Sequence, residues 1–387
     1  MAITLLVTDR NLNVVGDPII GWTDLDVTLR FNEPASGNFS APAYLPLMQQ
    51  IRGGGYRIIV IRDGQVFCAG PIEKRGPEKW SVDGQDSNPG TITVSFSDDL
   101  ALAVARATYP DPSQPATAQT SVARWTASGS AETILRSLFN LNAGPGALAA
   151  RRVPKLVLGP VAGVGSNIVL GTRFEPLGDA ARTAALAGGG LGFRTQQVGQ
   201  QVELQVYGPT DRSRSVRFSR GLGNLREYEY DETAATVTAA IVGGKDEGTS
   251  RVIVERLNAA AIADGWRLEA FKDQRQSDDD AGDTTELDQA GDEALAEGAQ
   301  TARLSAVTID VPTQRYGVHY GLGDIVSIEL TSGVEVTDVV RAVQLKATPE
   351  TGELVSALIG SQEASSDPLW LTYTRDIARR LARLEAR

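Results

Sequence analysis

The residues best suited to chemistry are the acidic side chains between positions 278 and 297. This stretch holds nine Asp and Glu residues and no Lys or Arg, and so accounts for most of the net charge of −11. Clustered carboxylates are the oxygen ligands that Ca²⁺ prefers. Counted from Asp278, however, glycine occupies the fifth position and the twelfth position is not a glutamate, so the spacing differs from that of an EF-hand loop. The sequence favours a solvated acidic loop, with an opportunistic cation site as the alternative. The loop residues are Asp278, Asp279, Asp280, Asp283 and Glu286.

Other reactive groups are scarce. The chain has one histidine, His319, and one cysteine, Cys68, which excludes an internal disulfide and a histidine-rich metal site within one chain. His319 lies in the turn-rich stretch YGVHYGLGD, which is typical of a turn or a half-exposed strand. Gly144 and Gly146 enclose a proline after an expected helix, so they do not make a dinucleotide-binding loop. We therefore expect no cofactor, no metal and no enzyme activity.

The charge and the hydropathy pattern limit the classes of partner that we expect. A net charge of −11 disfavours general affinity for nucleic acid backbones. No stretch approaches the ~18 uncharged apolar residues of a membrane-spanning helix, so we expect no membrane insertion by this chain. The N-terminus lacks the basic region of a signal peptide, and we expect none.

The first expected domain, residues 1–105, is mostly β. Residues 25–31 alternate apolar and polar side chains with the period of a strand. The apolar run 56–62, the turn dipeptide Asp63-Gly64 and the return 66–72 predict a β-hairpin. Closely spaced short strands of this kind indicate a barrel-like domain or a sandwich.

The middle of the chain changes character. Residues 106–130 are rich in Pro, Ser, Thr and Ala, which predicts an extended loop or arm. Residues 131–230 predict a small peripheral α+β domain, with one helix that Ser130 caps and Gly144 stops and another at 176–186, laid on an antiparallel sheet. The expected fold class is therefore mainly β with an α+β insertion.

The last third returns to β structure before a terminal helix. We expect residues 231–363 to form a second β-barrel-like domain that carries the acidic loop 278–288. Residues 368–387 predict a helix with apolar side chains at three- and four-residue steps. This helix packs either on its own chain or on symmetry mates, and the Ser-rich break before it favours an assembly helix. The candidate intersubunit seam is Tyr373, Ile377, Leu381 and Leu384.

Three blocks of sequence resemble one family. A strand ending in RFNEP followed by a hairpin around RDG and then GPI is how many siphovirus minor tail or tail-tip baseplate hub proteins begin, especially in phages of actinobacteria. The blocks at residues 228–256 and 316–330 are similar to the later hub domain of the same proteins. None of the three blocks is catalytic, so the resemblance carries over no active-site residue.

The resemblance implies a structural role. Hub proteins of this kind have two tube-forming barrel-like domains per chain, and a homotrimer forms a pseudo-sixfold ring on the tail tube. Such a ring caps or extends the tube at the distal end of the virion tail and passes DNA through its lumen without specific binding. The implied partners are the distal tail protein, the tape measure protein, and other minor tail or receptor-binding proteins. Synthesis would occur in the host cytoplasm.

Two other function classes stay open. A β-rich module of the tail tip could bind cell-wall glycans, although the five tryptophans are scattered along the sequence. A tail-associated cell-wall hydrolase is the third class, but no pair of carboxylates is singled out by its spacing.

Overall fold

The computed structural model describes residues 3–52, 54–80, 90–245, 248–274, 284–299, 301–350 and 352–360. The fold is mainly β with a few helices, as expected. The chain forms two compact units. Unit 1 combines Met1–Tyr228 with Ser305–Arg387, and unit 2 is Glu229–Leu304.

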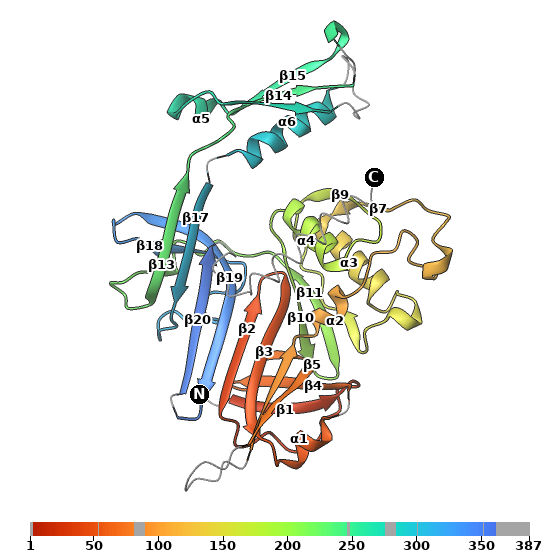
Figure 1. Ribbon diagram of the computed structural model, residues 1–387, viewed down its shortest axis with the longest axis vertical. Coiled ribbons are helices and arrows are strands. Elements are labelled where there is room, and N and C mark those ends of the chain that lie inside the picture. Colours follow the sequence, from red (N-terminus) through yellow and green to blue (C-terminus); the bar gives the residue numbers. More distant parts are fainter. Residues whose placement is uncertain are drawn as a thin grey trace. The chain divides into compact units, whose positions relative to one another are not determined.

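A twelve-stranded sheet is the framework of unit 1 (Figure 1). Ten strands follow in the order β1-β4-β5-β6-β3-β2-β19-β20-β17-β13, while β18 pairs with β19 and β12 pairs with β18. The strands are β1 (Ile3–Asp9), β2 (Asp24–Arg30), β3 (Glu33–Pro42), β4 (Tyr56–Arg62), β5 (Gln65–Lys79), β6 (Thr91–Ser97), β12 (Arg217–Phe218), β13 (Leu225–Thr233), β17 (Thr301–Thr308), β18 (Ile325–Glu329), β19 (Glu335–Thr348) and β20 (Gly352–Gly360). The chain leaves this sheet through β13 and returns through β17.

The junction of the sheet's two halves is the antiparallel pair β2 and β19. Val27 lies opposite Leu345 and Leu29 opposite Val343, so the alternating apolar side chains of β2 meet those of β19. Val27, Val343 and Leu345 are all buried. This pairing explains why the residues from Ser305 onward belong with the N-terminal strands. We expected residues 231–363 to be one domain, but the stretch is divided between the two units.

The predicted hairpin is confirmed. β4 and β5 pair from Arg57↔Pro71 to Arg62↔Gln65. Asp63 and Gly64 both have positive φ, 51° and 79°, as a tight two-residue turn requires. Two short helices, α1 (Pro46–Gln50) and α2 (Leu100–Val104), follow β3 and β6.

An α+β module is inserted between β6 and β12. Its helices are α3 (Ala131–Asn142) and α4 (Leu177–Ala187), with 3₁₀ turns at Ala116–Ala118 and Ala149–Arg151. Its strands are β7 (Trp125–Ser130), β8 (Leu156–Leu158), β9 (Asn167–Thr172), β10 (Gly192–Val198) and β11 (Gln201–Tyr207). They form the sheet β10-β11-β8 and the pair β7-β9. Apolar side chains of α3, small residues of α4, and Phe193 and Leu204 of the sheet share one core with Leu100 of α2.

Unit 2 is a small two-layer structure. Its sheet has the order β15-β14-β16, from β14 (Ala239–Gly243), β15 (Ile253–Leu257) and β16 (Glu269–Asp273). The other elements are a 3₁₀ turn (Gly248–Ser250), α5 (Ala259–Asp264) and α6 (Thr285–Glu297). Leu287 and Ala290 of α6 pack against Val242 of β14. Across the described ranges, no helix is long and apolar enough to cross a membrane.

Candidate functional site

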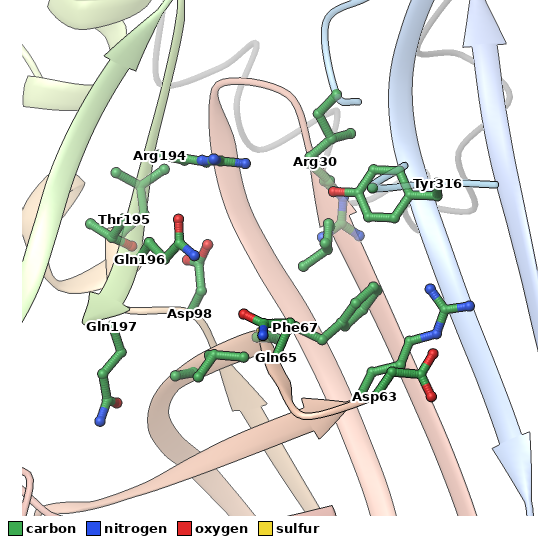
Figure 2. Close-up of a pocket in the computed structure, with 18 of the residues that line it drawn as sticks. Arg30, Asp63, Gln65, Phe67, Asp98, Arg194, Thr195, Gln196, Gln197 and Tyr316 are labelled. Carbon is green, nitrogen blue, oxygen red and sulfur yellow. The ribbon is translucent and has the colours of Figure 1, made fainter. Parts of the chain in front are cut away.

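Unit 1 contains a cavity of about 350 Å³ (Figure 2). Its wall is built by side chains of β2, β5 and β10, by the turn between β6 and α2, and by the segment that precedes β18. Three parts of the chain that are distant in sequence therefore meet at one place.

Four arginines line this cavity, and they fall into two kinds. Arg62 donates two hydrogen bonds to the carboxylate of Glu353 at 3.2 and 2.9 Å, and Arg315 lies 3.6 Å from Asp63. Arg30 donates to the Ser36 hydroxyl at 2.9 Å and to the Pro34 carbonyl, while Arg194 donates to the Gln205 side chain at 3.2 Å. Arg30 and Arg194 thus have neutral partners only, within the part of the chain that the structure describes.

Tyr316 supplies a hydroxyl group to the same wall. Its position is fixed by its backbone N–H, which donates to Asp310 at 3.0 Å, and by its ring, which meets Phe67 edge-on with centroids 6.1 Å apart. Burial raises the pKa of Tyr316 to about 12, so the hydroxyl stays protonated at neutral pH. Asp310 also accepts a hydrogen bond from the Tyr320 hydroxyl at 2.7 Å, which ties the segment before β18 together.

Two consecutive carboxylates lie beside the cavity at the start of α2. Asp99 is paired with Arg57, and both side chains are almost fully buried. Asp98 lines the cavity, and its Oδ1 is shielded and has no hydrogen-bond partner within the described residues. Burial raises the pKa of Asp98 to about 7, and the neighbouring Asp99 adds to the rise. Asp98 therefore carries only part of a negative charge at neutral pH.

The sheet of unit 2 has a second distinctive surface. The register sets Ile241 between Glu255 and Phe271, so these three side chains share one face, and α6 covers the opposite face. On the face away from α6, Ile253, Leu257 and Phe271 are 53%, 47% and 58% exposed. We call this surface, made by Ile241, Ile253, Leu257 and Phe271, the open face of unit 2. Exposed apolar side chains gathered on one face are typical of protein contact surfaces.

The residues singled out from the sequence fall mostly elsewhere. The seam residues Tyr373, Ile377, Leu381 and Leu384 lie outside the described residues, as do Asp278, Asp279, Asp280 and Asp283. Glu286 is exposed in the first turn of α6, so the expected loop 278–288 includes the start of a helix. Within the described ranges, no group of three or more His, Cys, Asp and Glu side chains is placed to hold a metal ion.

No pattern in the sequence marks the arginines of the cavity as a site. Arg30 occupies a polar position of the alternating strand β2, where charged side chains are ordinary. Arg194 does not belong to any recognisable sequence motif. Tyr316 was marked only by its place in the YGVHYGLGD block. The one histidine has a structural role, since His319 Nδ1 accepts a hydrogen bond from the backbone N–H of Arg315 at 3.0 Å.

Solved structures with a similar fold include three tail proteins, two of them from prophages. The 43 kDa tail protein of prophage MuSo2 from Shewanella oneidensis has a TM-score of 0.54 and 12% identity, over 92% of this chain and 98% of that one. The tail protein of Neisseria meningitidis MC58 has a TM-score of 0.50 and 13% identity, over 94% and 97%. Prophage tail protein gp18 of Listeria monocytogenes EGD-e has a TM-score of 0.50 and 10% identity, over 98% and 99%. At these identities the likeness shows the fold.

No curated protein sequence matches the chain. A family model does, and it extends over residues 4–361, from β1 through unit 2 to the end of β20. The match therefore includes every strand of the large sheet and both units. The chain belongs to the Siphovirus ReqiPepy6 Gp37-like protein family.

Proposed function

We propose that this protein is a structural component of the siphovirus tail tip, a hub ring that caps or extends the tail tube. The observation that carries the proposal is the fold: it matches tail proteins, two of them from prophages, over more than nine-tenths of both chains, in a member of a siphovirus family. In this account, three copies assemble at the distal end of the tail and adapt the sixfold tube to a threefold tip. The ring anchors distal tip or receptor-binding proteins.

The large sheet supports a role in a ring wall. β2 and β19 join the first and last strands of the chain into one continuous sheet, so unit 1 offers a wall much wider than either half alone. The net charge of −11 suits a lumen through which DNA passes, because a basic lumen would bind the phosphates. The open face of unit 2 supports contact with a neighbouring tail protein, since it leaves apolar side chains exposed.

Loss of the gene tests this proposal. Phages that lack it should make heads and tail tubes but no complete tip, and the wild-type gene supplied in trans should restore infectious particles. Antibody-gold labelling of wild-type virions should mark the distal end of the tail. Label along the tube or on the head would contradict the proposal.

A glycan-binding module is the second candidate. It is favoured by Trp266, which is 80% exposed three residues before β16, whose Phe271 is also exposed. Aromatic faces of this kind can stack on sugar rings. Binding of the isolated protein to host cell-wall glycans, lost in Trp266→Ala, would favour this function. Intact tails without host attachment in the gene deletion would do the same.

A further inference from the structure

The cavity of unit 1 brings together two guanidinium groups that lack a carboxylate partner. Arg30 uses only Nη1 for its hydrogen bonds to Ser36 and Pro34, and Arg194 uses only Nε for Gln205. Neither arginine forms an ion pair with a residue in the described ranges, whereas Arg62 and Arg315 on the same wall do. The Arg194 guanidinium also lies over the Tyr207 ring, 5.3 Å from its centroid. The N–H groups that these bonds leave over are of the kind that bind a carboxylate or a phosphate.

Tyr316 adds a third donor. Its hydroxyl is protonated at neutral pH and has no hydrogen-bond partner among the described residues. Figure 2 shows Arg194 approaching the cavity from β10, with Arg30 and Tyr316 on the side across from it. Donors from both walls are thus available to one acidic group held between them.

The rest of the wall favours a peptide over a nucleic acid. Phe67, Val66 and Leu322 make an apolar surface that a phosphate backbone would not use. Glu33 also lines the cavity, as does the partly charged Asp98, and each further phosphate of a nucleic acid chain would be repelled by them. A peptide with one acidic side chain has no such conflict, because Arg30 and Arg194 can balance a single carboxylate. The amides of Gln65 and Gln196 can bond to its backbone.

We propose that this cavity binds a peptide segment of a partner protein, with an Asp or Glu side chain held between Arg30 and Arg194 and an apolar side chain against Phe67. The inference rests on the proposed role as an anchor of further tail proteins, and it names the place on this chain and the chemistry of the partner. The cavity volume of about 350 Å³ suits two or three side chains, so the site would recognise a short segment.

Binding can be measured on the full-length protein with a defined probe. The capped peptide acetyl-Leu-Glu-Leu-amide is titrated into ¹⁵N-labelled protein, and amide shifts around Phe67, Arg194 and Tyr316 are followed. We expect saturable shifts confined to this wall. Arg194→Gln should weaken binding by about tenfold, as expected for one charged hydrogen-bonded contact. Tyr316→Phe keeps the ring and removes only the hydroxyl, and it should weaken binding by roughly three- to tenfold.

Matched controls make the outcome decisive. Arg214→Gln removes an exposed arginine that does not line the cavity, and it should leave affinity unchanged. The proposal is overturned if acetyl-Leu-Gln-Leu-amide binds as tightly, if inorganic phosphate or duplex DNA competes at equal concentration, or if Arg214→Gln acts like Arg194→Gln. It is also overturned if the peptide binds only after residues 361–387 are removed, because the cavity would then belong to the chain's own tail.

This test and the test of the hub are independent. If the protein builds a complete tail tip but does not bind the peptide, only the peptide-binding inference is wrong. If the protein binds the peptide but is absent from the tail tip, the hub proposal is wrong.

Discussion

Arg57 and Asp99 form a buried ion pair that joins β4 to the start of α2. The Arg57 Nε donates to Asp99 Oδ1 at 2.9 Å, a second bond runs from Nη2 to Oδ2, and the two side chains are only 5% and 3% exposed. Arg57 Nη1 also donates to Thr8 of β1 and to Gln197 of β10, each at 3.1 Å. One guanidinium group thus connects the large sheet with the inserted α+β module.

Removing one partner of this pair should be strongly destabilising. Asp99→Asn leaves Arg57 charged and buried without its counter-ion, so we expect the free energy of unfolding to fall by about 3–5 kcal/mol. Chemical denaturation of the purified protein measures the loss. Arg52→Gln is the control, because its bridge to Glu78 is exposed and should contribute less than about 1 kcal/mol. Equal losses in the two variants would contradict this assignment.

Asp98 should make stability depend on pH. Burial raises its pKa from the ordinary 3.8 to about 7, so between these values the native state holds a proton that the unfolded chain has released. The contribution of Asp98 to stability therefore falls as pH rises through this window, by at most about 1.4 kcal/mol per pH unit. In Asp98→Asn, the melting temperature at pH 8 should rise and its decline from pH 4 to 7 should flatten. The exposed Asp17→Asn should change neither, and an unaltered pH profile in Asp98→Asn would show that the carboxyl titrates normally.

The two faces of the unit 2 sheet should respond differently to substitution. Phe271→Ser alters the open face and should lower the free energy of unfolding by no more than about 1 kcal/mol. The ring is exposed, and the Arg251 guanidinium lies over it at 5.4 Å from the ring centroid. Leu287→Ala opens the covered face beneath α6 and should cost about 2–5 kcal/mol. If the open face contacts another tail protein, Phe271→Ser should still impair incorporation into virions. Normal incorporation would exclude that contact.

The acidic stretch should tolerate loss of charge. Mutual repulsion makes joint burial of Asp278, Asp279 and Asp280 costly, so we expect them to be solvated. Their simultaneous replacement by Asn should leave the melting temperature nearly unchanged. A large drop, or a wild-type melting temperature that rises with added Ca²⁺, would instead assign them a structural or cation-binding role.

The C-terminal segment tests how copies associate. If Ile377, Leu381 and Leu384 form an intersubunit seam, truncation after Asp367 should leave the melting temperature of the monomer little changed while tips fail to assemble. Ile377→Asp with Leu381→Asp should act like the truncation, because charges on a seam would be desolvated. Ala382→Asp, which lies away from the stripe in a helix of this register, is the control. A monomer destabilised by roughly 2–5 kcal/mol would show that the segment packs on its own chain.

Local pattern predicted much of the fold. The alternation in β2, the Asp63-Gly64 turn and the small-residue face of α4 are patterns within short stretches of sequence, and the structure confirms all three. β3 was not expected, because Pro34, Gly37 and Pro42 resemble loop residues. It pairs with β2 on one side and β6 on the other. A Cβ on Gly37 would lie 2.4 Å from the Phe96 ring, so glycine lets that ring pack on the strand.

Long-range pairing could not be predicted in the same way. No local signal shows that Val27 will lie opposite Leu345, more than three hundred residues away, and this pairing determines the membership of the two units. The cavity is missed for the same reason. Arg30 and Arg194 are unremarkable on their own strands, and they become a site only when β2 and β10 are brought to the same wall.

The most direct test of the hub is a reconstruction of the virion tail tip without imposed symmetry. The account predicts three copies of this chain in a closed ring at the distal end of the tube, with unit 1 sheets forming its wall. A ring with another copy number, or a tip in which this chain is absent, would contradict it.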